Sequence, residues 1–154
     1  MEEIALEQAT TERPVSVIRA SNVQGVPITG PPGNGLLHKW ASEAPIGWVN
    51  VPGDGSDFKD FVHVQDLVEC IMRVMTDPPP TRESIAIGSG KGIQLRDLAA
   101  IYNQMTGCEA EYGQNQDQEV FGIVDASEVE MRLGFRPTVS LEEMIKESFE
   151  ASGH

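Results

Sequence analysis

Two short apolar runs constrain the fold of this chain more than any other feature of its sequence. Val15-Ser16-Val17-Ile18 and Ser84-Ile85-Ala86-Ile87 are mostly apolar, which is typical of strands buried on both faces of a parallel sheet. Parallel strands need crossover connections that usually contain a helix, and Gly and Pro divide the chain into short elements of both periods. We therefore predict an α/β fold. Because a sheet of two strands is not stable alone, these strands require further neighbours.

Helical patterns fill much of the rest of the chain. In segment 66–77, apolar residues recur at helical spacing, and Asp66 is predicted to cap the first turn, with Glu69 in capping-box position. The predicted core face of this helix consists of Leu67, Val68, Ile71, Met72 and Met75. Further helices are predicted over about 1–11, 35–42 and 95–106, from Ser127 to Gly134 and from Ser140 with Glu143, and a further strand over 48–51. We expect residues 1–154 to form a single domain.

The chain is strongly acidic. It has 154 residues, with 11 Lys and Arg against 24 Asp and Glu, a formal net charge of −13. Such a surface repels nucleic-acid phosphates and anionic lipids, so neither is an expected partner. The apolar runs are only a few residues long, which predicts no membrane span and a soluble, cytoplasmic protein. The two cysteines and three histidines lack the spacing of a metal site or a disulfide framework, and no metal is predicted.

The segment Gly88-Ser89-Gly90-Lys91-Gly92 lies between a predicted strand and a predicted helix. A P-loop needs Ser or Thr after the Lys, and the dinucleotide fingerprint needs a third glycine where this chain has Ile93. We therefore predict a strand-to-helix turn with glycines of positive φ.

Two polar residues are candidates for ligand binding. Asn22 follows the first predicted strand, so it lies at the carboxyl edge of the sheet, where α/β folds bind ligands. Its amide can contact a phosphate or sugar oxygen, or it can bond its own backbone in a turn before Gly25. Lys59 can contact a phosphate or be an ordinary exposed lysine. Asp60 is expected to be a structural carboxylate in a turn or an ion pair, and His63 a packed, hydrogen-bonded histidine.

Five motifs, taken in order, resemble one enzyme family. They are Arg19-Ala20-Ser21-Asn22-Val23-Gln24-Gly25 with Gly53-Asp54-Gly55, Lys59-Asp60-Phe61-Val62-His63-Val64-Gln65-Asp66, S-I-A-I-G-S-G-K-G from Ser84, V-D-A-S-E-V-E from Val124, and S-L-E-E-M-I from Ser140. Together they are similar to the C-terminal half of the extended short-chain dehydrogenases/reductases, the UDP-galactose 4-epimerase-like family of NAD-dependent nucleotide-sugar epimerases and dehydratases. The resemblance implies the C-terminal portion of an NAD(P)-binding Rossmann-type fold, with a few parallel strands and a small mixed α/β substrate-binding subdomain.

The resemblance also implies roles for single residues. In the family, the Asn that matches Asn22 contacts the nucleotide sugar, and an Arg at the position of Lys59 grips the diphosphate. Asn22 and Lys59 are therefore the expected substrate-binding residues. Lys is a point charge without the Arg fork, and residues 114–119 contain no second Arg, so we expect weak nucleotide-sugar binding. Gln24 and Val26 replace the Tyr and Pro that the family has after this Asn.

The chemical half of that family has no counterpart in this sequence. The NAD-binding G-x-x-G-x-x-G motif is missing, and neither Tyr102 nor Tyr112 is followed by Lys four residues later, as the catalytic pair requires. We therefore expect that the N-terminal cofactor-binding part is absent and that the chain holds no catalytic or cofactor-binding residue. NAD is implied for the full-length family but not for this chain alone. The expected protein is truncated and inactive by itself.

An alternative hypothesis is an interaction protein. A strand that lacks its sheet neighbours exposes apolar surface, which a partner must cover. A homodimer or a separate Rossmann subunit would do so. A third hypothesis, an unrelated small α/β enzyme, finds no nucleophile–base constellation in the sequence.

Overall fold

The computed structural model describes residues 2–26, 35–113 and 122–153 as a mixed α/β protein. Its elements are α1 (Glu2–Glu7), β1 (Val15–Ala20), β2 (Asn22–Gln24), α2 (Leu36–Glu43), the 3-10 helix η1 (Ala44–Ile46), β3 (Trp48–Val51), β4 (Phe58–Lys59), β5 (Phe61–His63), α3 (Val64–Thr76), β6 (Arg82–Ile87), β7 (Ile93–Gln94), α4 (Leu95–Thr106), β8 (Glu109–Tyr112), α5 (Ala126–Leu133) and α6 (Leu141–Ala151). None of the described helices is long and apolar enough to cross a membrane. Residues 27–35 are rich in Gly and Pro, which predicts a loop. All of them except Gly35 lie outside the described residues.

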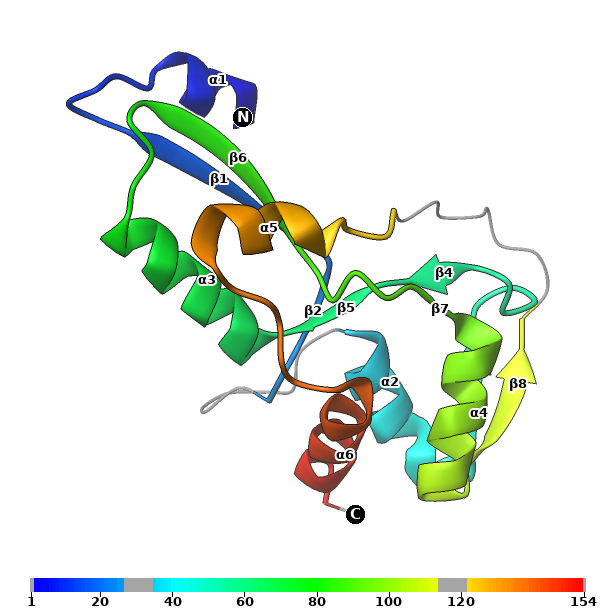
Figure 1. Ribbon diagram of the computed structural model, residues 1–154. Helices are drawn as coiled ribbons and strands as arrows, with labels where there is room; N and C mark the ends of the chain where they lie inside the picture. The colour runs from blue at the N-terminus through cyan, green and yellow to red at the C-terminus, as the bar shows by residue number, and fades with distance from the viewer. Residues whose placement is uncertain (1, 27–34, 114–121, 154) are drawn as a thin grey trace.

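The strands form four pairs, three of them parallel. β1 pairs with β6, β2 with β5 and β3 with β8 in parallel, and β4 pairs with β7 antiparallel. The two apolar runs of the sequence are thus direct parallel neighbours, with Ile18 opposite Ile85. Helices α1 and α3 pack on β1, α5 packs on β6, α2 packs on β3, and α4 packs on β3 and β8. Helix α6 packs against α2 and α4 (Figure 1). The predicted α/β fold with parallel strands is confirmed.

Two hydrophobic cores lie on either side of the β2–β5 pair. The first core consists of Leu37, Trp40, Val49, Val51, Phe61, Leu95, Leu98, Ala99, Tyr102, Cys108, Met144 and Ile145. The second core consists of Val62, Cys70, Val74, Ile85, Ile87, Val129 and Phe135. Successive residues of a strand point to opposite faces, so Phe61 enters the first core and its neighbour Val62 enters the second. Strand β5 therefore joins the two halves of the molecule.

Several helix ends follow from local sequence, as predicted. Gly107 ends α4 and Gly134 ends α5, and both have the left-handed backbone conformation (φ 78° and 59°) that suits glycine. At the start of α6, Ser140 and Glu143 form the predicted capping box. Hydrogen bonds from the Ser140 backbone N–H and hydroxyl lower the pKa of Glu143, which favours the ionised form that the box requires. Ser127, in contrast, lies inside α5, and the cap of that helix is Asp125.

The predicted start of α3 is wrong. The helix begins at Val64, and its cap is His63, whose Nδ1 accepts a hydrogen bond from the Gln65 N–H at 3.2 Å. The imidazole thereby takes the place that was predicted for the Asp66 carboxylate. Asp66 is buried within the first turn of α3 and accepts hydrogen bonds from segment 138–139 instead.

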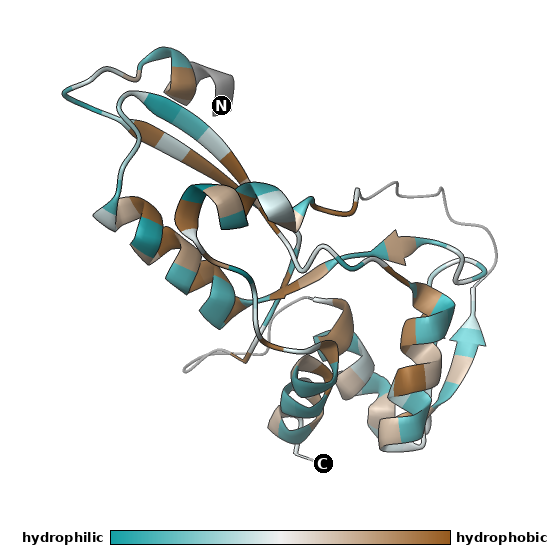
Figure 2. Cartoon of the chain, in the orientation of Figure 1, coloured by the Kyte–Doolittle hydropathy of each residue, from teal (hydrophilic) through white to brown (hydrophobic). Residues whose placement is uncertain are grey.

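The predicted core face of α3 is wrong as well. Apolar residues follow α3 along its length (Figure 2), but the buried ones are Cys70 and Val74, with Leu67 partly buried against them. A stripe of five others is between 36% and 70% exposed: Val64, Val68, Ile71, Met72 and Met75. We call these five residues the α3 stripe. The spacing of the apolar residues predicted the helix correctly. Which side of the helix is buried is determined by its packing against β1, β5 and α5.

Candidate functional site

The two residues predicted to bind substrate both lie next to Asp60. Asn22 is joined to it by hydrogen bonds, and Lys59 precedes it in the sequence. Asn22 begins β2, and both its backbone N–H (3.0 Å) and its side-chain Nδ2 (2.8 Å) donate to the Asp60 carbonyl oxygen. Lys59 ends β4 and immediately precedes Asp60. Asn22 thus bonds the backbone of a neighbouring segment and not that of its own turn. Among the described residues its Oδ1 has no hydrogen-bond partner, so this oxygen can accept from a ligand.

Asp60 lies under this site as a buried anchor. Its side chain is 1% exposed. Oδ1 accepts from the Ser89 N–H (2.9 Å) and hydroxyl (2.6 Å), and Oδ2 accepts from the N–H groups of Gly90 (3.3 Å) and Val124 (3.1 Å). The predicted structural role of this carboxylate is confirmed, although its donors within the described ranges are amides and a hydroxyl and not a cation. The turn that supplies most of them is the predicted strand-to-helix turn, in which Gly90 has φ 73°.

The end of β2 meets the beginning of α2. Gln24 is buried, and a Cβ atom on Gly35 would lie 2.6 Å from its Nε2, so the Gln24 amide packs directly against the residue that caps α2. No side-chain hydrogen bond caps this helix. Helix N-termini with uncapped N–H groups favour anions. Within the described part of the chain, the buried Oε1 of Gln24 lacks a hydrogen-bond partner.

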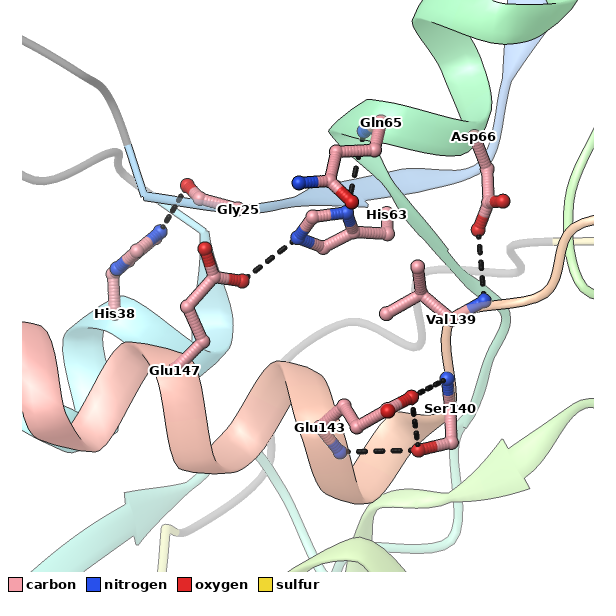
Figure 3. A network of polar contacts seen from close by, with 9 residues as sticks. All are labelled: Gly25, His38, His63, Gln65, Asp66, Val139, Ser140, Glu143 and Glu147. Carbon is pink, nitrogen blue, oxygen red and sulfur yellow. Dashed lines mark hydrogen bonds and ion pairs between the residues drawn. The ribbon is translucent and has the colours of Figure 1, made fainter.

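Two histidines hold the same region together. His38 on α2 lies with Nε2 at 2.9 Å from the carbonyl oxygen of Gly25, the residue after β2. His63 is buried, and because its Nδ1 accepts from Gln65, its Nε2 carries the proton and donates to Glu147 Oε2 on α6 at 2.7 Å. Figure 3 shows both contacts, with Glu147 reaching from α6 toward His63. The predicted packed, hydrogen-bonded His63 is confirmed.

Sequence reasoning did not find three of these groups. His38 and Glu147 stand in no recognisable motif, and Gln24 was noted only as a substitution. Burial of a polar side chain is the signal that marks Gln24 and His38, and it requires the fold. The predicted effect of the arginine-free segment 114–119 falls outside the described residues.

The described residues also form a cavity of about 630 Å³. Phe61, Ser89, Ile93 and Ile101 contribute to its wall, and neither Asn22 nor Lys59 does. Across residues 2–26, 35–113 and 122–153, no cluster of three His, Cys, Asp or Glu side chains could hold a metal ion.

Comparisons with known proteins relate the chain to nucleotide-sugar enzymes. No family profile matches it. It is 30% identical over 105 residues to GDP-L-fucose synthase 1 of Arabidopsis thaliana, covering 66% of this chain and 32% of that protein. It is 28% identical over 150 residues to dTDP-L-rhamnose 4-epimerase of Burkholderia thailandensis, covering 89% of this chain and 39% of that protein. The chain thus spans between a third and two fifths of the length of these curated relatives.

Solved structures show the same relation at the level of the fold. The chain superposes on MoeE5 in complex with UDP-glucuronic acid and NAD with a TM-score of 0.82 and 22% identity, covering 97% of this chain and 51% of that one. The corresponding values for UDP-glucose 4-epimerase from Stenotrophomonas maltophila with NAD and a formylated UDP-arabinopyranose are 0.81, 18%, 99% and 52%. In sequence and fold, the chain corresponds to the C-terminal half of the extended short-chain dehydrogenases/reductases, the family of NAD-dependent nucleotide-sugar epimerases and dehydratases.

Proposed function

We propose that this chain supplies a weak nucleotide-sugar site of the epimerase/dehydratase type and that its own residues do not carry out the redox step. The observation that supports the proposal is that Asn22, at the start of β2, bonds the carbonyl of Asp60, which directly follows Lys59 at the end of β4. Relatives and structural neighbours named for nucleotide-linked sugars add to this support.

The chemistry of the site suits a sugar joined to a diphosphate. Asn22 Oδ1 would accept a hydrogen bond from a sugar hydroxyl, because Nδ2 is engaged by Asp60. The Lys59 ammonium and the uncapped start of α2 would attract the phosphates. The net charge of −13 opposes any anionic ligand. We therefore expect a dissociation constant roughly in the millimolar range, which corresponds to about −4 kcal/mol.

Tyr102 does not suit proton abstraction. A tyrosine that serves as a base at neutral pH needs a lowered pKa. Burial raises the pKa of Tyr102 above its ordinary value instead, and its ring packs edge-on against Trp40 in the first core. We infer that the chain alone does not oxidise a sugar.

The proposed site is tested by nucleotide-sugar titration. UDP-glucose or dTDP-glucose added to the ¹⁵N-labelled chain should shift amide resonances around Asn22, Asp60 and Leu36 in a saturable manner. Asn22→Ala and Lys59→Gln should each weaken binding by about threefold to tenfold, because each removes one polar contact. Lys146→Gln removes a charge from the exposed face of α6 and should leave affinity unchanged.

Two results would contradict the proposal. One is saturable binding that neither Asn22→Ala nor Lys59→Gln weakens, which would place the ligand elsewhere. The other is formation of NADH when the purified chain is incubated with NAD and either sugar nucleotide, since that would require catalytic groups that we do not assign to it.

A second candidate function, self-association, is favoured by the α3 stripe. Its five apolar side chains lie on one surface of an otherwise strongly acidic chain, and contiguous exposed apolar surface of this kind marks interaction sites. In the described residues, β1 and β6 also pair only with each other, which leaves each with an open edge. We propose that in the purified chain a second copy covers the α3 stripe, with a separate Rossmann subunit as the alternative partner.

Sedimentation velocity at micromolar concentration tests this second function. The unmodified chain should sediment as a species larger than its 16.8 kDa mass. The double variant Met72→Lys and Met75→Lys should sediment as a folded monomer, because two charges on the stripe would have to be desolvated in the interface. Met131→Lys on α5 is the matched control, since Met131 is 81% exposed outside the stripe. A well-folded monomer for the unmodified chain would exclude self-association.

A further inference from the structure

We propose that Asp60 is the positioning residue of the nucleotide-sugar site, which it orients through its backbone and anchors through its side chain. This inference rests on the proposed function, because Asn22 and Lys59 are the groups that Asp60 positions. It extends the proposed function, because Asp60 would set the orientation of the site without touching the ligand itself.

The Asp60 carbonyl oxygen holds Asn22 in place. It receives both the backbone N–H and the side-chain Nδ2 of Asn22. Two bonds from one residue to one oxygen fix the position of Asn22 and also the plane of its amide. The Asn22 Oδ1 atom is thereby left as the end of the amide that can accept from a ligand, since Nδ2 is already bonded. Any displacement of the Asp60 peptide would turn this acceptor.

The Asp60 side chain holds that peptide in place. The Asp60 carboxylate receives four hydrogen bonds from two segments that lie 29 to 64 residues further along the chain, the 89–90 turn and Val124. The packing around it is tight: a Cβ atom on Gly88 would lie 2.5 Å from Asp60 Oδ2 and 2.8 Å from Val124 Cβ. The carboxylate therefore ties the peptide that carries the site to the body of the fold.

The chemistry of the junction requires a carboxylate. All four partners are donors, and ionised carboxylate oxygens only accept. Asp60→Asn would replace one acceptor oxygen with an NH₂ group. That group would face either the N–H and hydroxyl of Ser89 or the N–H groups of Gly90 and Val124, all of which donate to the carboxylate. We expect the Asp60 peptide to shift in response. Ser89→Ala is milder, because it removes the hydroxyl donor but keeps the Ser89 backbone N–H.

The experiment follows the side-chain NH₂ resonances of Asn22 in the ligand-free chain, together with UDP-glucose affinity. Asp60→Asn should move the Asn22 NH₂ resonances and weaken affinity by about tenfold. Ser89→Ala should move the same resonances less and weaken affinity by about twofold to threefold. Val74→Ala, which opens a cavity in the second core away from the site, should lower the melting temperature but change neither readout.

Each outcome decides one claim. The inference is overturned, and Asp60 is only structural, if Asp60→Asn changes the Asn22 resonances no more than Val74→Ala does. The same holds if, at equal fraction folded, Asp60→Asn changes the UDP-glucose affinity no more than Val74→Ala does. If Asp60→Asn does not fold, Ser89→Ala decides in the same way. If the unmodified chain binds no UDP-glucose, the proposed function fails, while the Asn22 resonances still show whether Asp60 sets the amide.

Discussion

Replacing Trp40 with Ala is expected to lower the free energy of unfolding by about 3–5 kcal/mol. Trp40 is fully buried in the first core, its ring packs edge-on to Tyr102 with centroids 5.4 Å apart, and its Nε1 donates to the Asn50 carbonyl at 2.8 Å. The substitution removes the ring and the hydrogen bond together. Domains of this kind are stable by only about 5–15 kcal/mol, so urea unfolding followed by circular dichroism should show a large loss.

Two variants separate the contributions of Trp40. Trp40→Phe keeps an aromatic ring but leaves the Asn50 carbonyl without its donor, and should lose less than Trp40→Ala. Trp48→Ala is the matched control, because Trp48 is only partly buried on β3. If Trp40→Ala and Trp48→Ala cost the same free energy, Trp40 does not organise the first core.

Replacing Asp66 with Ala should have the second largest effect, a loss of about 3 kcal/mol of unfolding free energy. The buried carboxylate accepts from the Thr138 N–H (3.0 Å), the Thr138 hydroxyl (3.2 Å) and the Val139 N–H (3.1 Å). Hydrogen bonds to charged groups contribute about 1.5–3 kcal/mol each and do not add fully. This contact joins the first turn of α3 to the segment that leads into α6 (Figure 3).

Hydrogen exchange locates the effect of Asp66→Ala. The Thr138 and Val139 amides should exchange faster in the variant than the amides of α4, because only the former lose their acceptor. Asp97→Ala, which replaces an exposed residue in the first turn of α4, is the control and should change stability much less. Uniform acceleration across the whole chain would mean that Asp66 stabilises the fold without specifically holding segment 138–139.

Local signals predicted most helices of this fold and the strands β1, β3 and β6, but not the short strands β2, β4 and β7 or the strand β8. The ends of α4 and α5 and the start of α6 depend on residues within one turn, such as Gly107, Gly134 and the Ser140–Glu143 box. The apolar runs that became β1 and β6 were recognisable because burial on both faces leaves little polar character. Both runs are strands of a parallel pair, as expected, but their pairing with each other was not predicted.

Long-range contacts explain what could not be predicted. The Asp66 carboxylate has its partners 72 and 73 residues away, so its sequence neighbourhood indicated a helix cap. The most continuous apolar pattern of α3 is the exposed α3 stripe, whereas the apolar residues that are buried are Cys70 and Val74. The family resemblance predicted that Asn22 and Lys59 bind substrate, but the hydrogen bond from Asn22 to the carbonyl of Asp60, the residue after Lys59, is visible only in three dimensions.

The sharing of β5 between two cores has a consequence for how this chain can vary. Phe61 and Val62 point in opposite directions, into different sets of apolar side chains. Inserting or deleting one residue here would exchange their destinations, placing an aromatic ring where a small branched side chain fits, and the reverse. The spacing of this short segment is therefore more constrained than its composition. Evolutionary indels and engineered tags should be tolerated in surface loops far from β5. They should not be tolerated within the three residues of β5, Phe61–His63, which contact both cores.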